Sequence, residues 1–419
     1  MRRVRAGQSE SQSIEVVAQQ AESPLAEGAV SVAMIQALIP LGLRAVEDAL
    51  QQEVTQLAGV RYARGDGHAD VVRWGQQAGS VFLADQKVPL RVPRVRDRRA
   101  KRELSLATYQ QLQTPRALDH GLFRRVLGGL SCRDYRQAAE AVPEAFGLTK
   151  SSVSRRFQRA SERELRTLQE RRLDDRQWLA LVLDGKSFAD DGIVIALGVS
   201  SEGEKRILGL VQTATENQRA CAAFLRELVE RGFAVTGRVL VVLDGAKGLR
   251  AAVQEVLGGR SEVQRCQWHK RENVLSYLPK SEHPMWRRKL QAAYAQPTYA
   301  AAKRALDRLE REVTLRNASA AASLREGMEE TLTLHRLGIF PALGRSFKTT
   351  NMLESVMARV EEKTVRVDHW RTSDQKLRWC AAALLAVEAQ FRKVKGYTNL
   401  PLLAKALEAK ITPSIRDAA

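Results

Sequence analysis

The clearest hydrophobic pattern begins at Trp178, where apolar and β-branched residues alternate or run together in short stretches separated by polar turns. Three such stretches in succession predict an antiparallel meander of strands. Helical spacing and short apolar runs then alternate, which predicts helices between further strands. The segments follow the order β-β-β-α-β-α-β-α over residues 178–188, 191–203, 205–215, 216–233, 238–245, 249–259 and 261–273, the last beginning as a strand and ending as a helix.

The tetrapeptide Val-Leu-Asp-Gly closes two of these apolar runs, at 182–185 and at 242–245. The first copy leads into another strand and the second into a helix, so an internal duplication is not indicated. The element order matches the ribonuclease-H-like plan, an α/β fold with a mixed sheet in which the first and fourth strands are neighbours. Asp184 and Asp244 are then expected to lie close together at matching strand ends. Taken singly, each Asp-Gly is more typical of a turn.

Two neighbouring carboxylates repel each other unless a cation lies between them. Mg²⁺ prefers oxygen ligands and keeps several waters, and a pair of such ions can support phosphodiester chemistry. A third acid is available in Glu354, near the start of a helix predicted within 347–366. The alternative for Glu354 is a capping box with Asn351, in which the glutamate only bonds back to the start of the helix.

The amino-terminal part has a different pattern of polar and apolar residues. Residues 1–28 are polar and predict a flexible arm, and residues 29–118 predict a small mixed region. In that region, helical spacing over 30–57 is expected to break or kink at Pro40, and alternation over 79–96 predicts a hairpin. The hairpin leads into a basic run at 91–103, which predicts a DNA-binding region or, equally, a solvated linker.

Residues 119–175 predict a helix-turn-helix. A helix ends near Phe146, Gly147 turns the chain, and Thr149 is a plausible N-cap of a second helix. Short hydroxyl and long cationic side chains on the outside of that second helix can reach base edges and phosphates in a major groove. An ordinary helical hairpin would have a similar outer face. The candidate DNA contacts are Lys150, Ser151, Ser152, Ser154, Arg155 and Arg156.

Charge and cysteine usage narrow the function classes. The 67 Lys and Arg against 48 Asp and Glu give a formal net charge of +19 in 419 residues, which favours a polyanionic partner. No apolar stretch is long enough for a membrane span and no signal peptide is apparent, so a cytoplasmic, nucleoid-associated protein is expected. The four cysteines form no CxxC pair, which argues against both a disulfide framework and a four-ligand zinc site.

The motifs LVLDGK, VVLDGAKGLRAAV, RCQWHKREN and TTNMLESVMARV resemble those of the Mutator-type transposases of bacterial insertion sequences, members of the DDE transposase superfamily. The segments FGLTKSSVSRRF and VPRVRDR also stand where that family has similar sequence. The resemblance implies a catalytic, metal-binding triad of Asp184, Asp244 and Glu354. It also implies a catalytic domain in two parts, 176–277 and 346–419, separated by an all-helical insertion at 278–345.

The family's Cys-x-x-His motif falls on Cys266 and His269. One such pair cannot hold zinc by itself. His269 is a candidate for contact with a DNA phosphate or with the acidic cluster. The alternative is that the two residues only pack at a strand-to-helix junction.

The resemblance implies binding to double-stranded DNA at terminal inverted repeats, followed by cleavage and strand transfer. In that mechanism, water activated by Mg²⁺ or Mn²⁺, expected as two ions, cleaves at the transposon end. The cleavage leaves a 3′-hydroxyl, which then attacks a phosphodiester of target DNA. Lys247 and Arg359 are further candidate phosphate contacts, and joining two ends predicts a homodimer. The alternatives are a non-catalytic DNA-binding regulator derived from a transposase and a structure-selective nuclease on the same fold. Binding to a membrane is not expected.

Overall fold

The computed structural model describes residues 24–62, 70–83, 86–113, 118–132, 149–213, 217–233, 237–367 and 369–409. These fall into two compact units, residues 1–160 and 161–419. The first helix predicted for the helix-turn-helix, the turn at Gly147 and residues 1–23 of the expected arm lie outside the described residues. Within the described chain, no helix has the length and apolar character that crossing a membrane requires.

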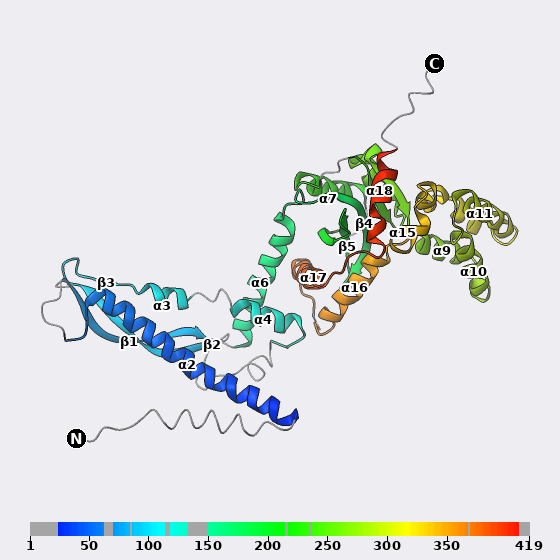
Figure 1. Ribbon diagram of the computed structural model, residues 1–419. Coiled ribbons are helices and arrows are strands. Elements are labelled where there is room, and N and C mark those ends of the chain that lie inside the picture. Colours follow the sequence, from blue (N-terminus) through cyan, green and yellow to red (C-terminus); the bar gives the residue numbers. More distant parts are fainter. Residues whose placement is uncertain are drawn as a thin grey trace, which may run out of the picture. The chain divides into compact units, whose positions relative to one another are not determined.

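The first unit is built on a long helix and a three-stranded antiparallel sheet (Figure 1). Helix α2 (Pro24–Ala58) lies along the hairpin of β1 (Val71–Leu83) and β2 (Gln86–Asp97), and β3 (Arg102–Leu104) pairs with β2. The predicted hairpin is therefore confirmed, although it starts eight residues earlier than the alternation indicates. Its core contains Leu50, Val54, Val81, Val92 and Val95.

Two expectations for this unit are wrong. Helix α2 begins at Pro24, so residues 24–28 are helical rather than part of an arm, and the helix passes through Pro40 without a break. An internal proline removes one backbone hydrogen bond at a cost of about 3 kcal/mol. The part of α2 after the proline compensates, because Val46, Leu50 and Val54 recur every four residues and pack onto the hairpin.

Three further helices complete the described part of this region: α3 (Ala107–Leu112), α4 (Leu118–Leu127) and α6 (Lys150–Glu170). Helix α6 is the predicted second helix of the helix-turn-helix. The Ser152 amide donates to Thr149 Oγ1 at 3.3 Å, which supports Thr149 as the capping residue. Val153 and Phe157 are buried as expected, and the Phe157 ring stacks on Phe123.

The second unit contains a five-stranded mixed sheet in the order β6-β5-β4-β7-β8. The meander is antiparallel, while β4 pairs in parallel with β7 and β7 in parallel with β8. The expected element order and the expected pairing of the first and fourth strands are therefore present. The strands are β4 (Trp178–Phe188), β5 (Asp191–Ser200), β6 (Lys205–Gln212), β7 (Val239–Leu243) and β8 (Ser261–Arg265).

Helices cover both faces of this sheet. Leu181, Leu183, Val241 and Leu243 form one core with α7 (Gln218–Glu230) and α8 (Lys247–Val256). Successive strand residues point to opposite faces, so the residues between them face the other side, where α16 (Asn351–Thr364) and α18 (Leu400–Glu408) contact β4 and α17 (Ser373–Glu388) contacts β6. Figure 1 shows α7 and α17 on either side of the sheet.

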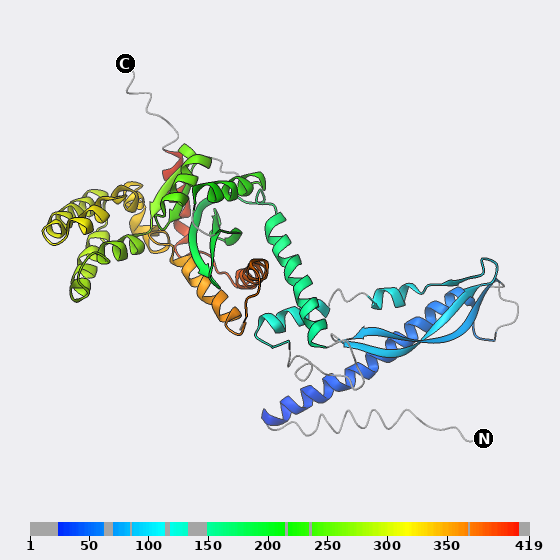
Figure 2. The same ribbon diagram turned by 180° about the vertical axis from the view of Figure 1, so that it is seen from behind.

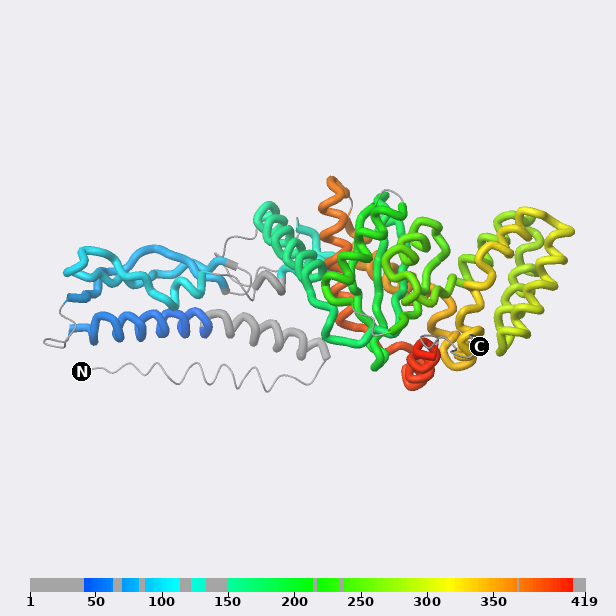
Figure 3. Tube along the Cα trace, turned by 90° about the horizontal axis from the view of Figure 1, so that it is seen from above, coloured from blue at the N-terminus to red at the C-terminus, as the bar shows by residue number. Residues whose placement is uncertain are grey.

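The chain between β8 and α16 is helical and has a hydrophobic core of its own, which includes Trp286, Leu290, Leu306 and Leu324. Figures 2 and 3 show these helices projecting from one end of the sheet. They are α9 (Gln267–Leu275), α10 (His283–Tyr294), α11 (Tyr299–Thr314), α12 (Ala318–Arg325), α13 (Met328–Thr331), α14 (Thr333–Arg336) and α15 (Phe340–Phe347).

Candidate active site

The two Val-Leu-Asp-Gly segments lie side by side in the sheet. Val182 is the register partner of Val242 in the parallel pair β4 and β7, so Asp184 and Asp244 occupy matching positions two residues further on. Alternate residues of a strand share a face, so both side chains are on the face of the sheet that α16 covers. Strand β4 does not end at Asp184, however. It continues to Phe188, as predicted for the strand over 178–188, and Asp184 pairs with Ile195 of β5. Asp184 is therefore not at a strand end, and the alternative of an Asp-Gly turn is not present there.

Asp244 does follow the end of its strand, and the turn after it is specific to glycine. Gly245 has φ +101°, and a Cβ at this position would overlap the Arg265 guanidinium. This backbone conformation lets the Ala246 amide donate to Asp244 Oδ1 at 3.0 Å. Helix α8 then begins at Lys247. The turn therefore fixes the Asp244 carboxylate at the carboxyl end of β7.

Asp184 is the buried member of the site, with 1% of its surface exposed. Neither carboxylate oxygen accepts a hydrogen bond from the described residues, and the nearest cation is Lys186, whose Nζ lies 3.1 Å from Oδ2. Burial raises the pKa of Asp184 to about 7, Lys186 opposes that shift, and the charges of Asp244 and Glu354 add to it. The structure thus brings the three acids near enough to act on one another.

Glu354 reaches this neighbourhood from the first turn of α16. The helix is capped by Thr350 rather than Asn351, and the Thr350 side chain makes no capping bond. The Glu354 carboxylate lies 3.7 Å from His269 Nε2, and no bond from it to the Asn351 amide is present. The capping-box alternative is therefore not supported, and Glu354 is directed toward another part of the chain.

Cys266 and His269 lie at the junction of β8 and α9, beside the start of α16. Cys266 is buried, its amide donates to Leu243 O at 2.7 Å, and Thr350 Oγ1 lies 3.8 Å from its sulfur. His269 Nδ1 lies 3.5 Å from the same hydroxyl. Burial raises the pKa of the Cys266 thiol and lowers the pKa of His269, although Asp244 and Glu354 partly oppose the latter. The pair therefore packs at the junction, and His269 also contacts the acidic cluster.

The donor set fits a divalent cation. Asp184 is buried beside two more acids, and the Lys186 ammonium offsets only part of their negative charge, so an oxygen-preferring cation is favourable here. In the described ranges, no three His, Cys, Asp or Glu side chains are arranged so that they could already hold a metal ion. The three acids are thus neighbours without forming a closed coordination shell.

The sequence matches the family model described as "Transposase, Mutator family" over residues 12–393. The chain belongs to this family. The similar curated proteins include the transposase for insertion sequence element IS6120 of Mycolicibacterium smegmatis, 30% identical over 246 residues, which are 57% of this chain and 74% of that protein. The transposase for ISRM5 of Rhizobium meliloti is 28% identical over 375 residues, 86% of this chain and 91% of that protein.

The candidate DNA contacts of this Mutator-family chain differ in exposure. Most of those on α6 lie on its surface, as does Lys247 at the start of α8. Arg156 is an exception, because it is 6% exposed and its guanidinium lies 5.9 Å from the Phe82 ring. Its predicted place on the outside of the helix is wrong, since it follows Val153 by three residues and so shares the buried face. The exposed contacts on α6 are Lys150, Ser151, Ser154 and Arg155, while Ser152 is half-buried and donates to Thr149 O.

Two residues of the site were missed from the sequence. Lys186 shares the strand face of Asp184 because it lies two residues further on, so the Asp-x-Lys spacing carries the signal. Thr350 connects Cys266 and His269 to the start of α16, but nothing in its local sequence distinguishes it from an ordinary helix cap. Its role depends on a contact between residues more than 80 positions apart.

Proposed function

We propose that this protein is the transposase of an insertion sequence, acting through metal-dependent cleavage and strand transfer in a ribonuclease-H-like catalytic domain. The observation that carries the proposal is the buried Asp184 carboxylate. It lies beside Asp244 and Glu354, and the Lys186 ammonium, 3.1 Å from Oδ2, offsets only part of the negative charge of the three acids. Family membership supplies the reaction class, and the relatives matched here are transposases of insertion sequence elements.

Asp184, Asp244 and Glu354 would hold one or two Mg²⁺ or Mn²⁺ ions. When bound, such ions activate the attacking oxygen and stabilise the leaving oxygen of a phosphodiester. The protein's own part is to position the ligands. The sheet fixes the two aspartates in register, the Gly245 turn orients Asp244, and His269 contacts Glu354 at the start of α16.

Lys186 has a second task in this proposal. In the free protein its ammonium partly neutralises Asp184. A bound cation would take over that neutralisation, and Lys186 would then be available to a DNA phosphate, since a lysine is a compact, mobile charge. The acid cluster would thereby bind cation and DNA together rather than either one first.

We assign recognition of the ends of the insertion sequence to the first unit and α6. The helix-turn-helix would place Lys150, Ser151, Ser154 and Arg155 of α6 against double-stranded DNA of the terminal inverted repeats. Joining two element ends in one reaction requires both to be held together, so a homodimer on DNA is part of the proposal. The net charge of +19 supports a polyanionic partner.

The experiment is a strand-transfer assay with labelled element ends, a supercoiled plasmid target and Mg²⁺. Asp184→Asn and Glu354→Gln should each lower joined product by about 100-fold or more, because each removes a carboxylate ligand of the cations that would stabilise the transition state. Asp190→Asn is the matched control, since it removes one carboxylate from the exposed turn of the same hairpin and should leave product within about twofold.

The other assignments predict different products. A structure-selective nuclease would cut the labelled ends without joining them to the plasmid. A regulator would bind the ends, yield no cleaved DNA, and lose nothing in Asp184→Asn. Either result would refute the transposase proposal.

A further inference from the structure

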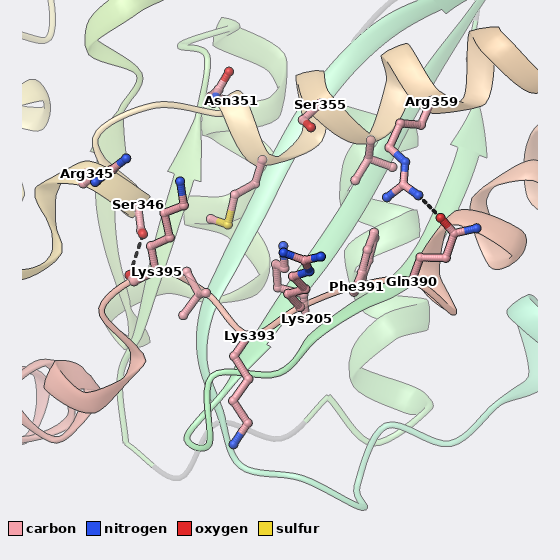
Figure 4. A pocket seen from close by; sticks show the side chains of 14 residues that line it. Lys205, Arg345, Ser346, Asn351, Ser355, Arg359, Gln390, Phe391, Lys393 and Lys395 are labelled. Atoms are coloured by element: carbon pink, nitrogen blue, oxygen red, sulfur yellow. Dashed lines mark hydrogen bonds between the residues drawn. The ribbon is translucent and has the colours of Figure 1, made fainter.

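A groove of about 770 Å³ lies in the second unit, beside the helix that carries Glu354 (Figure 4). Its 14 lining residues come from the start of β6, the end of α15, the first half of α16 and the segment 390–395 that follows α17. Asn351, Ser355 and Arg359 recur every four residues along α16 and so form one face of that helix. Glu354 is not among the lining residues and points elsewhere, toward His269.

The walls of the groove are strongly cationic. Six lining residues are Lys or Arg and none of the 14 is acidic. None of these six forms an ion pair with another residue in the described ranges of the chain. Burial, and then the charge of Arg359, lowers the pKa of Lys205, so the groove concentrates positive charge at a cost to the free protein. The six are Lys205, Arg345, Arg359, Arg392, Lys393 and Lys395.

Apolar side chains lie between these charges. Met352 and Val356 of α16, together with Phe391 and Val394, are among the lining residues. The Lys205 ammonium lies 5.2 Å from the centre of the Phe391 ring. Cations alternating with an aromatic and aliphatic surface are suited to a ligand that has both phosphates and flat bases.

A neighbouring hollow of about 420 Å³ shows that the pattern is specific to the groove. It shares Lys205, Phe391, Arg392 and Lys393 with the groove, but there other arginines meet acids. Arg171 pairs with Glu388 at 2.7 Å, and Arg176 pairs with Glu204. Acidic side chains therefore line the hollow but not the groove, so the excess of positive charge is greater on the side next to α16.

We propose that this groove binds a segment of unpaired DNA strand that continues from the scissile phosphate at the acid cluster. This inference rests on the proposed function. The apolar and aromatic side chains that line the groove can stack on bases only where the bases are unpaired. Five residues of helix separate Glu354 from Arg359, about 7.5 Å along the axis. A strand held at Glu354 therefore needs to cross only one helix to meet the cations beyond it.

An acidic peptide is the main competitor for such a surface. The groove shares α16 with the acid cluster, and a ligand that serves both places must reach a divalent cation with one end and the basic walls with the next. A polynucleotide meets both requirements through its repeating phosphates. The apolar lining further favours a strand whose bases are free to stack.

The test compares two charge-matched double variants of the full chain. Arg345→Glu with Lys393→Glu alters exposed groove residues, and Arg219→Glu with Arg316→Glu makes the same charge change at exposed positions elsewhere in the second unit. Binding of a labelled single-stranded oligonucleotide and of the matching duplex is measured by fluorescence anisotropy in EDTA at several salt concentrations. Circular dichroism melting verifies that both variants fold.

The groove variant should bind single strands about 10-fold or more weakly, with the salt slope reduced by about 1.4 for two lost phosphate contacts. The control should change by less than about twofold, and duplex binding should be similar in the two variants. Photo-crosslinking of a thiothymidine-containing strand should label residues 390–395 or α16.

Equal weakening of single-strand binding in both variants would overturn the inference, as would a loss confined to the duplex. Groove-dependent binding of polyglutamate without groove-dependent binding of DNA would assign the surface to an acidic peptide instead. EDTA prevents catalysis, so the anisotropy measurement does not depend on strand transfer. A negative binding result would refute only the groove proposal, and a negative strand-transfer result would refute only the proposed function.

Discussion

Replacing Asp184 by asparagine should stabilise the metal-free protein while abolishing its activity. The folded state raises the pKa of Asp184 from 3.8 to about 7 by burying it beside two other acids. Such a difference in pKa corresponds to roughly 4 kcal/mol of unfavourable free energy in the folded state at pH 8. The asparagine removes this cost but leaves Lys186 without its partner and a buried amide without one, which offsets about 1–3 kcal/mol. A net gain of about 1–3 kcal/mol is expected.

The sign of the pH dependence follows from proton counting. Between pH 3.8 and about 7 the folded Asp184 is protonated while the unfolded one is not, so folding binds a proton. The wild type therefore gains stability as pH falls, and the variant does not. Between pH 8 and pH 5 the advantage of Asp184→Asn should shrink by about 2.5 kcal/mol.

The assay is thermal unfolding of the full chain in EDTA at pH 8 and pH 5, with Asp190→Asn as control. At pH 8 the variant should melt at least about 2 °C above the wild type. Millimolar Mg²⁺ should raise the melting temperature of the wild type and not of the variant, because only a protein that binds the ion gains from it. A variant no more stable than wild type at pH 8, or a difference independent of pH, would refute the reasoning.

Three structural predictions follow from the second unit. Gly245→Ala should cost at least about 2 kcal/mol of stability and reduce activity, because the turn at Asp244 needs φ +101° and space beside Arg265. Arg231→Met should cost about 2–4 kcal/mol, because this buried side chain donates to carbonyls of α6, β6 and the segment between α6 and β4. Trp178→Phe should cost about 1–3 kcal/mol, because its indole donates to Leu173 O at 2.7 Å in the core.

Urea unfolding measures all three, and each has a matched control. Gly259→Ala places a methyl group in open space, Arg226→Met breaks only a surface pair with Glu255, and Trp268→Phe changes a side chain that is 42% exposed. Each control should stay within about 0.5 kcal/mol of wild type. A core variant that behaves like its control would show that the contact named for it contributes little.

The sheet could be predicted because its signals are local. Three short apolar stretches separated by polar turns predict β4, β5 and β6, and the apolar run before Asp244 predicts β7, which is buried throughout. The parallel pairing of β4 with β7 could be anticipated from the element order alone. The end of a strand is a weaker signal, and β4 continues past Asp184 because its hairpin with β5 keeps pairing to Phe188.

Contacts between distant segments could not be predicted in the same way. The approach of His269 to Glu354 depends on how the chain returns after the helical insertion, and nothing near either residue encodes that path. The burial of Arg156 similarly depends on the Phe82 side chain, which comes from the hairpin. A hydrophobic pattern states which face of an element is apolar, whereas it does not state which charged residue the tertiary contacts will cover.

The Gln267 amide donates to Lys348 O at 2.9 Å, so a hydrogen bond joins the two ends of the helical insertion. The insertion has a hydrophobic core of its own. Its length can therefore change during evolution without moving the ends that bear His269 and Glu354, much as a surface loop with closed ends tolerates extra residues. The same junction is a natural place to graft a foreign module onto this protein.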